Sequence, residues 1–267
     1  MIPACPDDSW NQGDPYERYI GRWSLLVADA LLDWLDPAPG LRWLDVGCGT
    51  GAVCAAIRDQ CAPAELTGID PSQGFLATAR TRLPTDATFR IGDAMHIPCE
   101  SAQFDVIVSA LVLNFVASPL SAVREMRRTA SNGATIAAYV WDYSGGMALI
   151  RHFWAAAIEL DGRAAALDEG QRFPLCQAGA LESLFAKAGL SDVFGAPIDI
   201  ATHFVDFDDY WSPFLGAQGP APAYAMSLDE SARNRLRDRI QQRLPTASNG
   251  SISLGARAWA ARGRVSK

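Results

Sequence analysis

Apolar and polar positions follow two rhythms over residues 15–143. Nearly unbroken apolar runs, typical of buried strands, alternate with runs in which apolar residues recur every three or four positions, as in helices. The strand-like runs span 41–46, 64–70, 87–93, 104–113 and 134–143, and the helix-like runs span 15–36, 51–61, 72–83 and 118–130. This alternation predicts a parallel sheet with helices on both faces.

The rhythm changes after Tyr143. Residues 145–169 predict one long helix without a strand partner, followed by a helix over 177–190 and a strand over 192–204. The next helix carries an apolar stripe four residues apart, formed by Leu228, Ala232, Leu236, Ile240 and Leu244, and residues 250–265 predict a long final strand. We therefore expect a single α/β domain over 1–267 that contains two inserted segments.

Composition narrows the partners of the chain. Of its 267 residues, 49% are hydrophobic and 20% are charged, which predicts a packed globular core. The net charge of −7 disfavours a broad phosphate-binding surface, so we expect no nucleic-acid partner. The longest uncharged run, residues 106–123, contains serines, Asn114 and Pro119, and it fits a buried strand and a loop better than a membrane span.

The six cysteines form no CxxC pair and no histidine spacing that suits zinc, so we expect no metal site. The first twenty residues carry Asp7, Asp8, Asp14 and Glu17, which argues against a secretory leader. We therefore interpret the cysteines as reduced, mostly buried thiols of a cytoplasmic protein.

Candidate chemistry concentrates in residues 43–52, WLDVGCGTGA. Its first two glycines and final alanine satisfy the loose dinucleotide pattern G-x-G-x-x-G/A. Asp45, Gly47, Gly49 and Gly51 also satisfy a second pattern, acidic-x-G-x-G-x-G. The glycines alone do not discriminate between them. A carboxylate two residues before the first glycine would repel a pyrophosphate, whereas it suits a ligand with an ammonium group.

Two more carboxylates follow neighbouring strands. Asp70 closes the second strand, 19 residues after Gly51, where an acidic side chain can accept both ribose hydroxyls of either nucleotide class. Asp93 follows the third strand and can accept from an exocyclic adenine amine. Taken singly, each could equally be a helix cap or a turn residue. Together with the glycine loop, they favour a nucleoside that carries an amino acid.

As a set, these motifs resemble those of the class I S-adenosylmethionine-dependent methyltransferases. The matching pieces are LDVGCGTG (44–51), GIDPS (68–72), GDAMHIP (92–98) and FDVIVSALVLNFV (104–116), in the order and spacing of that family. The stretch YERYIGRWS (16–24) is similar to bacterial small-molecule members, and distantly to the ubiquinone/menaquinone C-methyltransferases.

The resemblance implies a Rossmann-like α/β fold with a seven-stranded mixed sheet, its last strand antiparallel beside the sixth, and helices on both faces. It assigns residues 15–143 to the cofactor-binding core and the insertions at 144–175 and 204–248 to a cap over the substrate. One departure is SNGAT (131–135), where many relatives have Pro-Gly-Gly; it lies in a turn and should not affect chemistry.

The resemblance also implies which residues hold S-adenosylmethionine. The three glycines allow close approach to its methionine part, Asp45 lies near the ammonium, and Asp70 takes the ribose hydroxyls. The other candidates in these motifs are Cys48 and Pro71 beside the cofactor, Asp93, Ala94 and Met95 around the adenine, and Ser109 and Ala110 near the sulfonium.

Several of these roles have competing interpretations. Asp45 could instead fix the loop by accepting backbone N–H groups, and Cys48 is well explained as a small packed residue. Arg22, a basic residue in an apolar helix, could hold the cofactor carboxylate or be a solvated charge on the helix face.

On the acceptor side the sequence is less informative. His152 lies in the first insertion and is a candidate base, although a surface or partly buried histidine is the simpler interpretation. Tyr139, Trp141 and Tyr143 end the fifth strand, so at least one could face the acceptor. The helically spaced stripe Phe204, Phe207, Tyr210 or Trp211, and Phe214 fits core packing first and an acceptor pocket second.

We therefore expect in-line methyl transfer from S-adenosylmethionine to a small molecule, leaving S-adenosylhomocysteine. The position after the fourth strand reads LNFV rather than the [DN]PP[YF] of amino-methylating nucleic-acid enzymes. Two alternatives are a cofactor-binding protein without catalysis and, on the glycine pattern, an NAD-dependent oxidoreductase. We expect no membrane partner, and a homodimer remains open.

Overall fold

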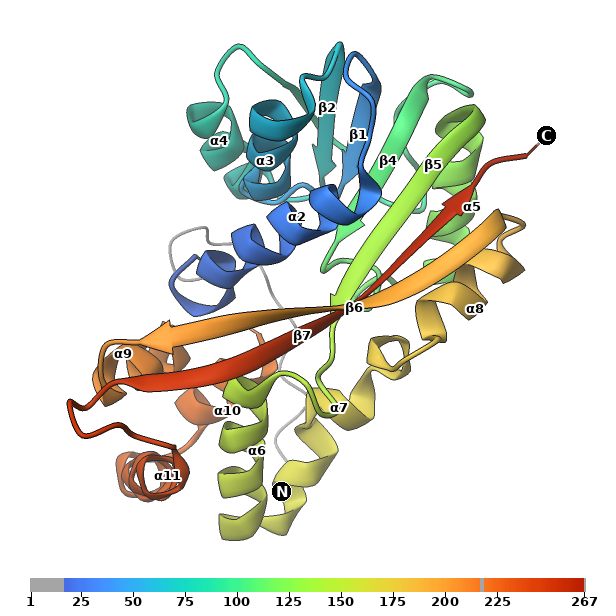
Figure 1. The fold of residues 1–267 in the computed structure, drawn as a ribbon. Helices are drawn as coiled ribbons and strands as arrows, with labels where there is room; N and C mark the ends of the chain where they lie inside the picture. Colours follow the sequence, from blue (N-terminus) through green and yellow to red (C-terminus); the bar gives the residue numbers. More distant parts are fainter. Residues whose placement is uncertain (1–16, 217–218, 267) are drawn as a thin grey trace.

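The computed structural model describes residues 17–216 and 219–266, with side chains from Tyr19 onward. In this part of the chain, seven strands form one sheet in the order β3-β2-β1-β4-β5-β7-β6 (Figure 1). They are β1 (Arg42–Val46), β2 (Glu65–Asp70), β3 (Thr88–Ile91), β4 (Phe104–Ala110), β5 (Ala130–Trp141), β6 (Ser191–Phe204) and β7 (Ile252–Arg264). Strands from β3 to β5 run parallel, whereas β7 is antiparallel to both neighbours, so the predicted mixed sheet is confirmed.

Helices cover both faces of this sheet. A π-helical turn, η1 (Glu17–Gly21), leads into α2 (Arg22–Leu35), which lies with α3 (Ala52–Cys61) and α4 (Gln73–Arg82) on one face (Figure 1). Helices α5 (Pro119–Thr129) and α8 (Ala180–Lys187) cover the other face. Within the described ranges, no helix combines the length and the apolar character needed to cross a membrane.

Local signals start the helices next to the strand ends. Ser72 caps α4 by accepting from the backbone N–H of Phe75, and Ser118 caps α5 in the same way with Pro119 in the first turn. Because β1 lies in the middle of the sheet, its residues are buried on both faces, which explains its apolar run.

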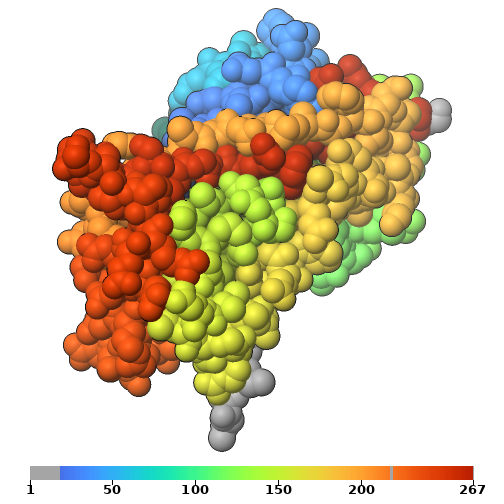
Figure 2. All heavy atoms as spheres, turned by 60° about the horizontal axis from the view of Figure 1, so that its bottom comes forward, coloured from blue at the N-terminus to red at the C-terminus, as the bar shows by residue number. Residues whose placement is uncertain are grey.

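The two inserted segments gather at one end of the molecule. The first forms α6 (Ala148–Leu160), η2 (Gly162–Leu167), α7 (Glu169–Arg172) and η3 (Pro174–Cys176). The second forms α9 (Phe207–Trp211), η4 (Ser212–Gly216), α10 (Pro220–Ser227) and α11 (Glu230–Arg243). Although far apart in sequence, α6 contacts both α10 and α11, and the segments lie side by side below the long β6–β7 pair (Figures 1 and 2).

The single helix predicted over residues 145–169 is broken in the structure. Helix α6 ends at Leu160, and two aspartates then cap short new turns: Asp161 accepts from the N–H of Arg163, and Asp168 accepts from that of Gly170. Aspartate competes with the helix for backbone donors, and this competition outweighs the continuing apolar periodicity.

The aromatic stripe that begins at Phe204 belongs to the core. Phe204, Phe207, Tyr210, Trp211 and Phe214 are all buried and contact one another in a chain of rings. Phe214 also stacks on Phe153 of α6, with the ring centroids 4.7 Å apart. These contacts bury apolar area between the two insertions, and they support the core interpretation of the stripe.

Candidate functional site

A cleft opens at the carboxyl ends of the central strands β1, β2, β4 and β5. It encloses about 800 Å³, including space open to solvent. The carboxyl ends of the strands are where ligands bind in open α/β sheets. The lining residues come from η1, the ends of these four strands and the start of α4: Ile20, Gly47, Gly49, Asp70, Pro71, Ser72, Phe75, Ala110, Leu111, Val112, Phe115, Trp141 and Tyr143.

The glycine loop after β1 turns tightly because its glycines have left-handed backbone angles. The φ angle is +79° at Gly47, +51° at Gly49 and +81° at Gly51. A Cβ at Gly47 would overlap Val112, and a Cβ at Gly51 would press on Ala79 of α4. At Gly49 the nearest atom to such a Cβ is 3.9 Å away, so this glycine presents bare backbone to the cleft.

Asp70 joins the glycine loop to the end of β2. Its Oδ2 accepts from the backbone N–H of Gly49 at 2.9 Å, and its Oδ1 accepts from that of Ser72 at 2.8 Å. Burial raises the pKa of Asp70, while the two backbone hydrogen bonds act in the opposite direction. Each oxygen keeps a lone pair for a ligand, because a carboxylate offers about four acceptor sites.

Asp45, at the end of β1, and Cys48, within the glycine loop, are not among the residues that line the cleft. Asp45 is fully buried; its Oδ2 accepts from the thiol of Cys54 at 3.3 Å, and its Oδ1 has no hydrogen-bond partner among the described residues. Burial raises the pKa of Asp45 to about 7. The Cys48 thiol is buried and hydrogen-bonded to that of Cys54, so it packs as a small residue.

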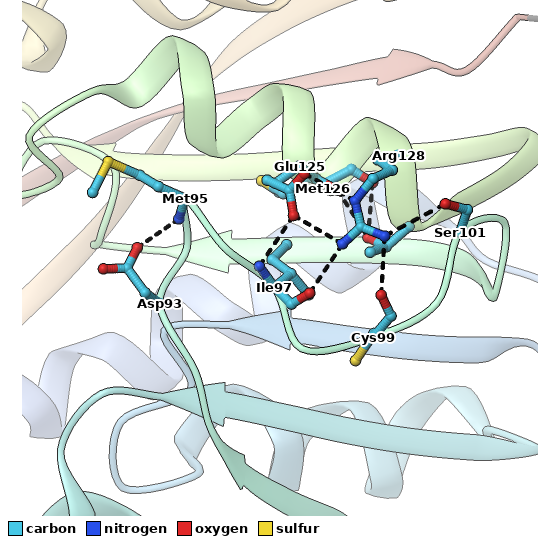
Figure 3. Close-up of polar contacts among 9 residues, drawn as sticks. Asp93, Met95, Ile97, Cys99, Ser101, Glu125, Met126 and Arg128 are labelled. Carbon is cyan, nitrogen blue, oxygen red and sulfur yellow. Dashed lines mark hydrogen bonds and ion pairs between the residues drawn. The ribbon is translucent and has the colours of Figure 1, made fainter.

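The turn after β3 carries the predicted adenine residues. Asp93 is exposed, and its Oδ1 accepts from the backbone N–H of Met95 at 2.6 Å, which holds the turn (Figure 3). Ala94 and Met95 are half-buried beside it. These three residues lie outside the set that lines the cleft.

An ion pair on α5 clamps the rest of this loop (Figure 3). The guanidinium of Arg128 pairs with Glu125 and donates to the carbonyl oxygens of Ile97 at 2.9 Å and Cys99 at 3.0 Å. Glu125 accepts from the N–H of Ile97 at 3.1 Å, so both backbone groups of that residue are held. The sequence pattern gave no sign of this clamp, because its partners are backbone atoms.

The two predicted site residues at the end of β4, Ser109 and Ala110, have different surroundings. Ser109 is buried and donates its hydroxyl to the carbonyl oxygen of Val46 at 2.9 Å, which ties β4 to β1. Ala110, the next residue, lines the cleft. The alternation follows from the strand, in which successive side chains point to opposite faces.

Of the predicted site residues, Arg22 contacts the second insertion and His152 lies in the first. Arg22 pairs with Asp209 of α9 at 2.8 Å, and its guanidinium lies over the rings of both Trp23 and Phe204, which contact each other edge-on. His152 lies half-buried in a shallow groove on α6 with neighbours that include Arg243, and burial lowers its pKa. Neither side chain lines the cleft.

Several lining residues were not predicted. Leu111, Val112 and Phe115 come from the SALVLNF stretch, where an apolar strand pattern hides the turn that exposes them. Ile20 belongs to the apolar stripe of the first predicted helix and gave no separate signal. The remaining additions are Ser72 and Phe75, of which the serine could have been found as a helix cap.

Two buried polar groups, Glu169 and Tyr19, do not line the cleft. Glu169 of α7 is 2% exposed and accepts from the indole N–H of Trp154. Burial raises the pKa of Glu169 to about 7. Tyr19 is also buried, and Glu169 is one of the charges that raise the pKa of its phenol. Among the described residues, no group of three His, Cys, Asp or Glu side chains is placed to hold a metal ion.

Comparison with known proteins identifies the family. Residues 44–138 match the model of a methyltransferase domain. The ubiquinone/menaquinone biosynthesis C-methyltransferase of Cereibacter sphaeroides is 31% identical over 116 residues, which cover 42% of this chain and 46% of that protein, about half its length. A malonyl-[acyl-carrier protein] O-methyltransferase of Enterobacter lignolyticus is 33% identical over 215 residues, or 80% of this chain and 78% of that protein.

This chain belongs to the class I S-adenosylmethionine-dependent methyltransferases. The fold agrees: the Haemonchus contortus phosphoethanolamine N-methyltransferase 2, solved with S-adenosyl-L-methionine, superposes with a TM-score of 0.57 at 16% identity. That likeness covers 94% of this chain and 56% of the other, and it shows the fold alone. The family's cofactor is S-adenosylmethionine, and the cleft of this protein lies at the carboxyl ends of the strands, where a nucleoside is expected.

We predict that the Arg128 clamp rigidifies the loop that follows β3. Arg128→Ala removes the donors to Ile97 and Cys99, so amide hydrogen exchange over residues 97–101 should rise by about tenfold or more. The matched control is Arg127→Ala, since the neighbouring Arg127 donates to the carbonyl of Ser266 at the chain surface. Equal exchange in the two variants would contradict the clamp.

We also predict a pH-dependent stability difference between the wild type and Glu169→Gln. The folded-state pKa of about 7 lies above the usual value of 4.5, so folding disfavours the ionised carboxylate. The wild type should lose up to about 3 kcal/mol relative to the variant as pH rises from about 4.5 to 7, with no further change above. Urea unfolding at a series of pH values measures this. A difference that stays constant across that range would show that the carboxylate does not titrate there.

Proposed function

We propose that this protein transfers a methyl group from S-adenosylmethionine to a small, apolar or aromatic acceptor. The observation that carries the proposal is one continuous cleft. Its first wall is the glycine loop with Asp70, and its second wall is formed by the aromatic side chains Phe115, Trp141 and Tyr143. A nucleoside site and an acceptor site that share one cleft bring the reactants together.

The residues of the first wall fit the cofactor. Gly49 offers bare backbone at the cleft, where the methionine part would approach, and Asp70 would take the ribose hydroxyls on its remaining lone pairs. Asp45, two residues before Gly47, does not line the cleft, but its buried Oδ1 has no hydrogen-bond partner among the described residues, and this free acceptor close to the loop suits an ammonium group. Asp93, Ala94 and Met95 would hold the adenine.

When bound, the cofactor supplies an electrophilic methyl group on a positively charged sulfur. The contribution of the protein is then proximity, alignment and exclusion of water, worth up to about 7–11 kcal/mol in favourable cases. The second wall, formed by Phe115, Trp141 and Tyr143, would orient the acceptor and exclude water from the cleft. A base is needed only for an acceptor that arrives protonated, and His152, which lies outside the cleft, is poorly placed for that role.

The charge of the cleft favours an uncharged acceptor. Among the lining residues that the structure describes, Asp70 is the one carboxylate and no lysine, arginine or histidine is present. A carboxylate or phosphate on the acceptor would therefore lack a cationic partner in this cleft. The names of the two relatives point to quinone biosynthesis and to malonyl-[acyl-carrier protein]. The aromatic wall favours an acceptor of the first kind.

Two further expectations accompany this proposal. Cys48, Cys54, Cys61, Cys99 and Cys176 are free thiols, which supports a reducing compartment such as the cytoplasm. An NAD-dependent activity is disfavoured, because the family to which the chain belongs uses S-adenosylmethionine.

Calorimetric titration tests the cofactor assignment. We expect S-adenosylhomocysteine and S-adenosylmethionine to bind the wild type and NAD not to bind. Asp70→Ala removes the ribose acceptor and the tie to Gly49, so it should weaken S-adenosylhomocysteine binding by about tenfold or more. Asp33→Ala, on the exposed face of α2, is the control and should bind normally. Tight NAD binding without the other two ligands would refute the proposal.

Mass spectrometry tests the acceptor class. Incubation of the wild type and S-adenosylmethionine with a panel of neutral phenols and quinols, matched to carboxylated analogues, should give a mass increase of one methyl group on the neutral compounds. Preference for the carboxylated analogues would overturn the acceptor class, and binding of the cofactor without any transfer would favour a non-catalytic role.

A further inference from the structure

A strained residue lies in the wall of the cleft. Leu111, the first residue after β4, has a φ of +61°, a left-handed conformation that bulky L-residues rarely adopt. Its backbone N–H donates to the carbonyl oxygen of Tyr139 on β5 at 2.8 Å, so the conformation is held by the sheet. Leu111 also lines the cleft, beside Ala110 at the strand end.

The strained turn places the next residue, Val112, against the glycine loop. The place of a Cβ on Gly47 lies only 2.4 Å and 2.9 Å from the two methyl carbons of Val112. The isopropyl group therefore packs directly on the bare backbone of that glycine. The carbonyl oxygen of Val112 accepts from the N–H of Phe115 at 2.8 Å, which closes a compact turn.

This contact joins the two walls of the cleft. Gly47 belongs to the loop that carries Gly49 and its bond to Asp70, whereas Val112 belongs to the turn that carries Phe115. The position of the loop relative to the second wall therefore depends on the turn at Leu111.

We propose that Leu111 and Val112 are positioning residues, whose left-handed turn presses the valine onto Gly47 and holds the glycine loop in its cofactor-binding position. The inference rests on the proposed function, since it concerns how the loop receives the cofactor. It does not require the acceptor to be known, because S-adenosylhomocysteine is a sufficient probe.

Two substitutions of Leu111 separate positioning from apolar lining. Leu111→Ile keeps the apolar bulk but is β-branched, so it opposes a positive φ; Leu111→Asn loses the apolar side chain but tolerates this conformation. We expect the isoleucine variant to bind S-adenosylhomocysteine about tenfold more weakly than the wild type, and the asparagine variant to stay within about threefold. If Leu111 merely lines an apolar wall, the order of the two variants is reversed, and that result would overturn the proposal.

The valine contact has its own matched control. Val112→Ala should weaken S-adenosylhomocysteine binding by about tenfold, whereas Val123→Ala, which removes the same two methyl groups from the buried face of α5, should leave the affinity within about twofold. Thermal unfolding of each variant identifies a temperature at which all are folded. Equal affinities for the two alanine variants would refute the positioning role. A wild type that binds no S-adenosylhomocysteine would instead refute the proposed function.

Discussion

The close approach of Gly47 to the turn after β4 is the constraint on which the cleft depends. A side chain at this glycine would overlap Val112, and its φ of +79° is unfavourable for other residues. With no side chain there, the loop after β1 and the turn after β4 can lie in contact. The cleft between them then opens at the carboxyl ends of the strands. The strain at Leu111 is the cost of this arrangement, and the bond from its N–H to Tyr139 helps to hold it.

Two carboxylates near the loop have different surroundings and so different chemistry. Asp70 receives two backbone N–H groups, which favour its charged form against the effect of burial. Asp45 receives one thiol, a weak donor, and burial raises its pKa to about 7. Asp70 therefore holds the loop through the N–H of Gly49, whereas Oδ1 of Asp45 has no hydrogen-bond partner among the described residues.

The insertions affect the cleft through the N-terminal segment. Ile20 of η1 lines the cleft, and its neighbours are attached to the second insertion: Tyr19 packs edge-on against Phe214, and Arg22 pairs with Asp209. The second insertion and the cleft are thus connected by side chains that lie far apart in the sequence. The ion pair is partly exposed and is worth at most about 1 kcal/mol, so the aromatic contacts supply most of the attachment.

Local signals in the chain were enough to predict the sheet and the motifs around the cleft, because apolar periodicity and glycine spacing are properties of short stretches. The strand rhythm predicted a parallel sheet, and the resemblance to the methyltransferase family added its antiparallel strand. The spacing of Gly47 and Asp70 predicted the strand ends that meet at the cleft. Three other features follow from tertiary contacts. The tertiary structure pairs Arg22 with Asp209, clamps Ile97 with Arg128, and turns Leu111 into a left-handed conformation. Each of these depends on partners distant in sequence or on backbone atoms, which leave no periodic signal in the chain.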